Sequence, residues 1–484
     1  MIKIILVISF LFSLVHLAEA KCNFNCSAKV KLENPELIIK EGKIPLFKNH
    51  SLKPTKKNII LTDYNSYNYD YCSLKGWYLK KYPSNFSHIN KKFKQLYTSN
   101  LQNNFNYNGN KKKSKDFDLI DDFDENMYTI HEDCLSGDTK SCKGIQKLVV
   151  NFQKSDALTQ NKSPMSEKPQ IYFDSVNRIL KPLLLAYSTS SQVLGRHKND
   201  NQIKEWALSA IYQNTYDPFE TEATIFESYN NVREKDMIRE TFTICRKQNN
   251  NNRCGSDPAQ NHSLNSGYLA MMYGVLWSDD HMFHVGLDGY VKTLESVDND
   301  GVLPTEARRG GNGLSYSGFT ITILLNIYET ALNQGHDLEK EYPVTQSLHK
   351  AVKYILDVVE DEIKIYPYSK RDWTSWKGSP KKQYINGTTV FAWVRPYLLR
   401  FSNHPNSKRI MELHNKLATS DNIPQRQKEL LNGLVRGNFK NKTFSKNFIY
   451  FNKYDEDDLK EPYIDDYNIG SIGSPLCFYN RDQK

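Results

Sequence analysis

Apolar residues recur at helical spacing through most of the chain after residue 172. In an amphipathic helix, apolar side chains return every three or four positions and share one face. The runs with this spacing are Ile179–Leu184, Trp206–Ile211, Leu269–Leu276, His284–Leu294, Phe319–Leu332, Leu348–Val359 and Val390–Leu399. Short segments with Gly, Pro or Asn separate them, and convincing alternating strands are scarce. The pattern predicts an all-α protein made of helix hairpins.

The spacing alone does not show how these helices close into a domain. Helical toroids and helical repeat arrays produce the same pattern, but no repeat of fixed period marks this chain as a solenoid. Its 484 residues could form one large toroid or two or three ordinary domains.

The first twenty residues have the pattern of a cleavable secretory signal. Lys3 precedes an apolar run at residues 4–17, and the sequence Ala-Glu-Ala at residues 18–20 resembles a cleavage site. The run is shorter than the ~20 residues of a membrane span, so cleavage is favoured over the alternative of a signal anchor. We expect a periplasmic or secreted mature chain that begins near Lys21 and has no membrane contact.

Eight cysteines in an exported chain favour disulfide bonds over metal-binding thiolates. They are Cys22, Cys26, Cys72, Cys134, Cys142, Cys245, Cys254 and Cys477. Their pairing is open. Cys245 and Cys254 could form a bridge that stiffens the approach to residue 261. Cys134 could equally pair with Cys142, or Cys72 with either of these two.

The net charge narrows the class of partner. A formal charge of +9 suits a polyanion, and an exported protein meets acidic polysaccharides rather than nucleic acid. No basic and aromatic nucleic-acid module is visible. The general abundance of Lys and Asn is an alternative explanation for the charge. We expect a monomer that acts on an acidic polysaccharide.

Two acidic or histidine-bearing segments could suggest a metal. The segment 298–301 with Glu306 lacks the ligand spacing of a calcium-binding loop and is more typical of a turn. His281 and His284 follow two aspartates but lack a clear third ligand. We therefore expect no metal and no other cofactor.

Four residues form the most informative chemical pattern of the chain. Asn261 and His262 are adjacent, Arg309 follows His262 after 47 residues (309 − 262), and Tyr316 follows Arg309 after seven (316 − 309). An amide and a guanidinium can neutralise a carboxylate, while a phenol or an imidazole can move a proton beside it. Each also has an ordinary structural alternative. An Asn-His pair can open a helix, Arg309 can be a solvated loop residue, and Tyr316 can belong to the core.

The sequence around these residues resembles the alginate lyases that cleave poly-mannuronate, which are secreted or periplasmic enzymes with an α/α-toroid fold. The specific stretches are Gln260-Asn261-His262-Ser263, Gly301-Val302-Leu303-Pro304-Thr305-Glu306, Arg308-Arg309 and Leu314-Ser315-Tyr316. Weaker similarity extends over roughly residues 75–400. It includes Lys81-Tyr82, Gly137-Asp138, Asp156-Ala157-Leu158, Lys204-Glu205-Trp206-Ala207-Leu208 and Ala392-Trp393-Val394-Arg395-Pro396-Tyr397.

The resemblance implies a role for each residue. Asn261 and Arg309 would neutralise the uronate carboxylate, which makes the C5 proton easier to remove. Tyr316 would accept that proton and return it to the departing O4, helped by a neighbouring guanidinium that favours the phenolate. His262 would neutralise, orient or act as a base on guluronate. The substrate would also contact Arg308 and the lid pair Lys81 and Tyr82.

The chain also departs from the family pattern. Leu264 and Asn265 stand where aromatics commonly follow, which removes a sugar-stacking platform. Ser-Gly-Phe at 317–319 replaces His-Asn-Tyr, a glycine-rich run follows residue 309, and Arg395 replaces an acidic residue. The substrate is therefore in more doubt than the type of reaction.

The resemblance and the composition together give a domain layout and three hypotheses of function. We expect a signal peptide at 1–20, an irregular extension at 21–74, a lyase-like toroid at 75–435 and a C-terminal appendage at 436–484. The first hypothesis is a poly-mannuronate lyase. The second is the same elimination on another uronic-acid polymer, and the third is a carbohydrate-binding toroid without turnover.

Overall fold

The computed structural model describes the helical body of the chain. The described residues are 52–55, 59–61, 90–91, 93–98, 123, 126–127, 130–131, 133–135, 137–158, 169–215, 243–248, 251–256, 260–307, 310–369 and 393–418. The expected signal peptide at 1–20 and the expected appendage at 436–484 lie outside them.

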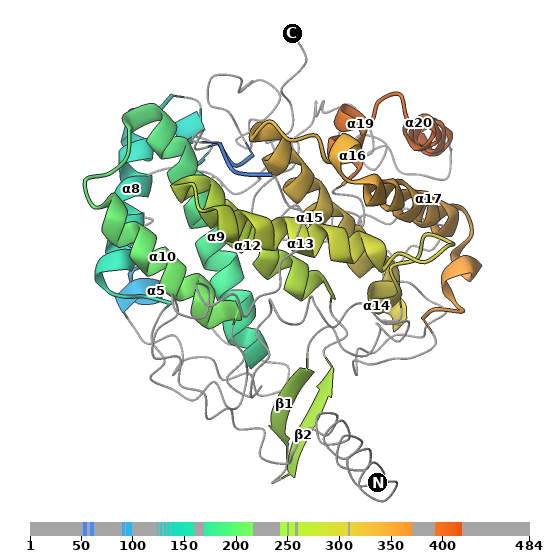
Figure 1. Cartoon of the computed structure of the whole chain (residues 1–484), viewed down its shortest axis with the longest axis horizontal. Helices are drawn as coiled ribbons and strands as arrows, with labels where there is room; N and C mark the ends of the chain where they lie inside the picture. Colours follow the sequence, from blue (N-terminus) through green and yellow to red (C-terminus); the bar gives the residue numbers. More distant parts are fainter. Residues whose placement is uncertain are drawn as a thin grey trace, which may run out of the picture.

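Helices make up almost all of the described chain (Figure 1). The longer ones are α8 (Thr139–Lys154), α9 (Pro169–Leu194), α10 (Asp200–Thr215), α12 (Gln260–Trp277), α13 (Asp280–Glu295), α15 (Gly313–Asn333), α17 (Gln346–Glu360) and α20 (Pro405–Ala418). The shorter ones are α5 (Lys94–Thr98), α14 (Pro304–Ala307), η6 (Gly310–Asn312), α16 (Leu338–Glu341), η7 (Pro343–Thr345), η8 (Glu362–Ile365) and α19 (Val394–Arg400). The helices predicted from apolar spacing are confirmed, except that the run at 390–399 is helical from Val394 and its first three residues lie outside the described ranges.

Helices α12 and α13 form a tight antiparallel hairpin in the middle of the molecule (Figure 1). The Asp279 carboxylate accepts the backbone N–H of Met282 at 3.0 Å and caps the start of α13. Further along, a methyl group on Gly286 would overlap the side chain of Met271, so only glycine allows the two helices to approach this closely.

Helices α9, α12 and α15 run parallel and pack side by side as an inner layer. Lys181 on α9 contacts Asn265 near the start of α12, and Arg196, just after the end of α9, contacts the Leu276 carbonyl near the end of α12. The two helices therefore run in the same direction. Each inner helix is followed in the chain by a helix packed against it, namely α10, α13 or α17. This repetition of hairpins confirms the predicted all-α class and the helix-hairpin construction of an α/α toroid.

The inner helices are apolar around most of their circumference, and they are buried accordingly. Helix α17 instead has two faces. Leu348, Val352 and Ile355 are buried, whereas Lys350 and Lys353 are exposed, and α17 packs on α15. This difference identifies α17 as an outer helix.

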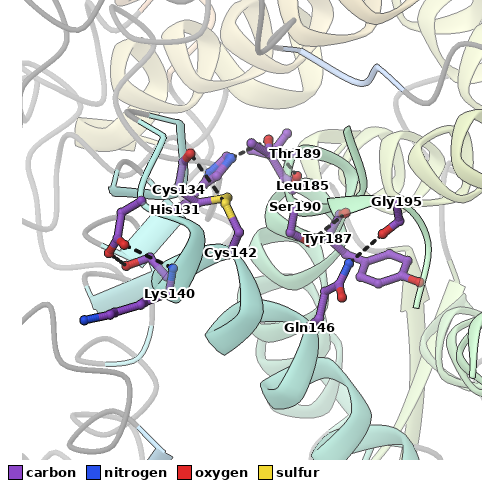
Figure 2. The surroundings of a disulfide bond; sticks show 12 residues. His131, Cys134, Lys140, Cys142, Gln146, Leu185, Tyr187, Thr189, Ser190 and Gly195 are labelled. Carbon is purple, nitrogen blue, oxygen red and sulfur yellow. Dashed lines mark hydrogen bonds between the residues drawn. A yellow bond between two sulfur atoms is a disulfide. The ribbon is translucent and has the colours of Figure 1, made fainter. Parts of the chain in front are cut away.

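A disulfide bond joins Cys134 to Cys142 at the start of α8 (Figure 2). The pairing is one of the alternatives that the sequence left open. Nearby, the Asp138 carboxylate caps α8 by accepting the Lys140 N–H at 3.0 Å. The side chain of His131 meets the Thr189 hydroxyl of α9 at 2.7 Å. The start of α8 is therefore fastened to α9.

A two-stranded antiparallel hairpin, which the sequence pattern did not predict, precedes α12. Strand β1 (Thr243–Gln248) pairs with β2 (Asn251–Ser256), and residue 260 begins α12 only a few positions later. The register sets the Cα atoms of Cys245 and Cys254 opposite each other. A disulfide between these two residues stays a prediction.

Part of the expected N-terminal extension packs on the helical body. We call residues 52–55 and 59–61 the strap, because they lie across the end of α15. Polar side chains at the end of this helix and just after it bond to strap carbonyls: Asn333 to Ile60 at 2.6 Å, Gln334 to Ile59 at 2.8 Å and His336 to Lys53 at 2.8 Å. The side chain of Ile60 is completely buried.

Within the described ranges, no helix combines the length and the apolar character that crossing a bilayer requires.

Candidate active site

Two of the predicted site residues lie in the first turns of the parallel helices α12 and α15. Asn261 is the second residue of α12, and Tyr316 is the fourth residue of α15. The short helix α14 contacts both of these helices. The structure therefore brings the two residues to the same end of the inner layer.

A buried carboxylate holds the start of α12. The backbone N–H of Asn261 donates to Oε1 of Glu306 at 2.7 Å, and the Glu306 side chain on α14 is completely buried. The first N–H groups of a helix have no partner within the helix and carry its positive dipole end, so a carboxylate stabilises this position. Asn261 is thus inside the first turn, and its backbone is fixed by Glu306.

The same short helix sets the start of α15. Gly313 lies directly against the Ala307 backbone of α14, and a methyl group at position 313 would overlap the Ala307 carbonyl oxygen. The Ser317 hydroxyl donates to the Gly313 carbonyl oxygen at 2.8 Å and occupies an acceptor of the first turn. Tyr316 lies in this turn and is partly exposed, so its phenol is not part of the closed core.

A second buried pair lies one turn further along α12. The ammonium group of Lys181 on α9 donates to Oδ1 of Asn265 at 2.5 Å. Lys181 is 1% exposed and Asn265 is 8% exposed. Because residues four apart share a helix face, Asn265 lies on the same side of α12 as Asn261. Two buried residues of opposite charge type, Lys181 and Glu306, therefore both contact the first turns of α12.

The remaining predicted site residues lie outside the described part of the chain. This applies to Lys81, Tyr82, Arg308 and Arg309. The backbone of His262 belongs to α12, but its side chain lies outside the description. Their roles stay predictions.

The positions that depart from the family pattern are mostly buried. Leu264 is completely buried and belongs to the core rather than to an open sugar-binding platform. Ser317 and Gly318 are buried in α15, and Phe319 is partly buried. Asn265 therefore combines a departure from the family pattern with a polar side chain beside Asn261.

The two segments considered for metal binding have structural partners. The Asp298 carboxylate accepts the backbone N–H groups of Asp300 at 3.0 Å and of Val302 at 2.8 Å, as expected for a turn. The imidazole of His284 contacts the Leu52 carbonyl of the strap. Among the described residues, no group of three or more His, Cys, Asp or Glu side chains could hold a metal.

Sequence reasoning did not identify Glu306 or Lys181 as members of the site. Glu306 was visible as the last residue of one family-like stretch, directly before the two arginines. Lys181 was visible only as a charge inside the otherwise apolar run 179–185. A charge in a buried helical run was the available signal, because such a group requires a polar partner.

Comparison with known proteins identifies the same region. Residues 221–365 match the model of the alginate lyase family. An alginate lyase of Pseudomonas syringae pv. syringae is 28% identical over 152 residues, which are 31% of this chain and 37% of the relative. An alginate lyase of Pseudomonas syringae pv. tomato is 27% identical over 148 residues, covering 30% and 36%. The chain spans little more than a third of the length of these relatives.

Solved structures of alginate lyases are also similar to the chain. Alginate lyase A1-III from Sphingomonas species A1 has 16% sequence identity and a TM-score of 0.44, covering 80% of this chain and 92% of that one. A complex of alginate lyase A1-III with a tetrasaccharide gives the same values. The resemblance seen in the sequence is confirmed by the family match, and residues 221–365 are the part of the chain that is similar to the alginate lyase family.

Proposed function

We propose that the protein is an exported polysaccharide lyase that cleaves alginate, and within it poly-mannuronate, by β-elimination. One observation carries the proposal. The family-matched segment contains Asn261 and Tyr316, and the structure sets both residues in first turns that adjoin the same short helix, α14.

The proposed reaction removes the C5 proton of a uronate and breaks the bond between C4 and the glycosidic oxygen. The electron pair of the C5–H bond becomes the C4–C5 double bond, and the leaving O4 receives a proton. Asn261 and Arg309 neutralise the carboxylate, whose negative charge would otherwise oppose proton removal. Tyr316 takes the C5 proton and returns it to O4, and His262 assists as a second acid or base.

The fold supports an anionic substrate at this end of the inner layer. The N-terminal ends of α12 and α15 both adjoin α14, and a helix N-terminus carries a partial positive charge. Partial exposure of Tyr316 agrees with a group that reacts with a polymer rather than with a buried structural phenol. The contacts of Lys81, Tyr82 and Arg308 with the polymer belong to the same proposal.

Another uronic-acid polymer is the second candidate substrate. Asn265 favours it, because an amide stands where an aromatic commonly follows in the family, and the two side chains contact sugars differently. In either case the protein acts as a monomer outside the cytoplasm.

The test is an elimination assay on the purified mature protein. Poly-mannuronate, poly-guluronate and several glycosaminoglycans are supplied separately, and the ultraviolet absorbance of the unsaturated uronate product is followed. We expect turnover of poly-mannuronate that falls by about 10²–10⁴ in Tyr316→Phe, the usual contribution of a general acid or base.

Tyr328→Phe is the matched control. Tyr328 lies on the same helix, and its hydroxyl donates to Asp337 at 3.0 Å, far along α15 from Tyr316. This variant should retain full turnover. If product forms only from another polymer, that polymer rather than poly-mannuronate is the substrate. If no polymer gives product, the proposal of a lyase is wrong.

A further inference from the structure

Lys181 fixes the orientation of the Asn265 amide. An ammonium group is a donor only, so the amide must turn its oxygen toward Lys181, as the 2.5 Å contact with Oδ1 requires. The two amide N–H groups then point away from α9. This assignment follows from the charge of lysine, which makes the flipped amide unfavourable.

The amide nitrogen of Asn265 has no hydrogen-bond partner among the residues that the structure describes. The side chain is more than nine-tenths buried, at 8% exposure. The nitrogen is not one of the fully buried side-chain atoms without a partner, so its N–H groups reach the solvent although most of the side chain is covered. A ligand oxygen can replace water as the acceptor of these N–H groups.

The place of this donor indicates the kind of ligand. Asn265 lies one helical turn after Asn261 on the same face of α12. A polyuronate held by Asn261 would extend past it as a row of acidic sugar units, each with carboxylate and hydroxyl oxygens that accept hydrogen bonds. The nearby ammonium also polarises the amide and makes its N–H groups better donors.

We propose that Asn265 is a substrate-binding residue that donates its amide N–H to an oxygen of the polyuronate, and that Lys181 is the positioning residue that fixes this amide. The inference rests on the proposed function, because it names a further contact in the same site. It predicts that this chain recognises an oxygen atom where an aromatic residue would have stacked on the sugar face.

The first experiment measures KM and kcat of Asn265→Asp on the preferred polymer. The carboxylate retains an acceptor for Lys181 but loses both N–H donors, and it repels an acidic substrate. We expect KM to rise at least about tenfold, the loss of a hydrogen bond to a charged group, with a smaller change in kcat. Asn265→Ala serves as the second variant and should raise KM in the same direction.

A double-variant comparison separates positioning from structure. Lys181→Met removes the ammonium at similar volume and lets the amide turn either way, so KM should rise in the wild-type background. In the Asn265→Ala background the same change should leave KM unaltered, because the amide that Lys181 orients is absent. A purely structural lysine would change KM equally in both backgrounds.

Lys292→Met is the matched control for a buried lysine. Lys292 is 2% exposed and pairs with Asp288 of the same helix, α13, at 2.7 Å. Its loss should lower the melting temperature without changing KM. Thermal unfolding of every variant shows which of them fold.

The outcomes distinguish this inference from the proposed function. An active wild type whose KM is unchanged in Asn265→Asp and Asn265→Ala would overturn the inference and leave the lyase intact. If the wild type cleaves none of the polymers, binding of saturated mannuronate oligosaccharides, measured by calorimetry, tests the inference instead. Weaker binding by Asn265→Ala than by the wild type supports the inference, and equal or absent binding overturns it.

Discussion

The two ends of the inner helix pair α12 and α15 are built in different ways. At the end of α15, Asn333, Gln334 and His336 bond to carbonyl oxygens of the strap. At the beginning of the pair, charged Lys181 and Glu306 are buried, and the amide nitrogen of Asn265 has no acceptor among the described residues.

This difference separates polar groups that stabilise the fold from those that we propose to bind the substrate. At the strap end the described hydrogen bonds are made within the chain, so these polar side chains stabilise the fold without a ligand. At the α14 end, Lys181 orients the Asn265 amide, and we propose that a substrate oxygen accepts its N–H group.

The largest expected effect on activity comes from replacing an asparagine at the α14 end, and a second asparagine at the strap end serves for comparison. Asn261→Ala should lower kcat/KM by about 10²–10³, as for removal of a donor that stabilises developing charge. The bond to Glu306 comes from the backbone N–H and remains in this variant, so the start of α12 should keep its position. Polymer turnover and thermal unfolding are measured on the same preparations.

Asn333→Ala is the counterpart at the strap end. It removes the side-chain bond to the Ile60 carbonyl, so the melting temperature should fall while kcat/KM stays at the wild-type value. A loss of turnover in this variant, measured well below its melting temperature, would contradict the separation of the two ends.

The next effect concerns packing of the strap. Ile60→Ala removes a completely buried side chain and should lower the free energy of unfolding by about 2–4 kcal/mol. Urea denaturation gives this value, and the elimination assay at low temperature gives the activity. Unchanged stability would mean that the strap contributes little to the fold.

The smallest effect is a pH dependence near the strap end. His349 on α17 packs against Phe401, which in turn packs against Tyr328 of α15. Burial, followed by the charge of His404, lowers the pKa of His349 to about 4. The folded state therefore prefers the neutral ring, and stability present above pH 6.5 is lost as the pH falls toward 4.

The measurement compares urea denaturation at pH 7 and pH 5. The wild type should lose on the order of 1–2 kcal/mol of unfolding free energy between these values, and His349→Gln should lose less. Equal losses in the two proteins would assign the acid sensitivity to other groups.

The helices were predictable from the sequence, whereas the contacts that assemble the site were not. Apolar spacing predicted α9, α12, α13, α15 and α17, because burial of one face or of the whole circumference leaves a periodic pattern. Strands β1 and β2 left no such pattern, since they contain mostly polar residues joined through backbone pairing.

The contacts within the candidate site were even less predictable from the sequence. The family-like stretches identified Asn261 and Tyr316, but Lys181 and Asn265 are separated by 84 residues and Asn261 and Glu306 by 45. A local sequence pattern does not predict contacts between residues that are far apart in the chain. Only packing of α9 and α14 against α12 reveals these partners.

The strap also constrains the order in which the molecule can fold. Its hydrogen bonds with Asn333 and Gln334 join residues 273 and 275 positions apart, among the most distant contacts of the described chain. During synthesis these strap residues leave the ribosome long before α15 exists. The apolar side chain of Ile60 therefore remains without its native contacts until α15 has been synthesised. Packing of the strap on the end of α15 is necessarily a late event in folding.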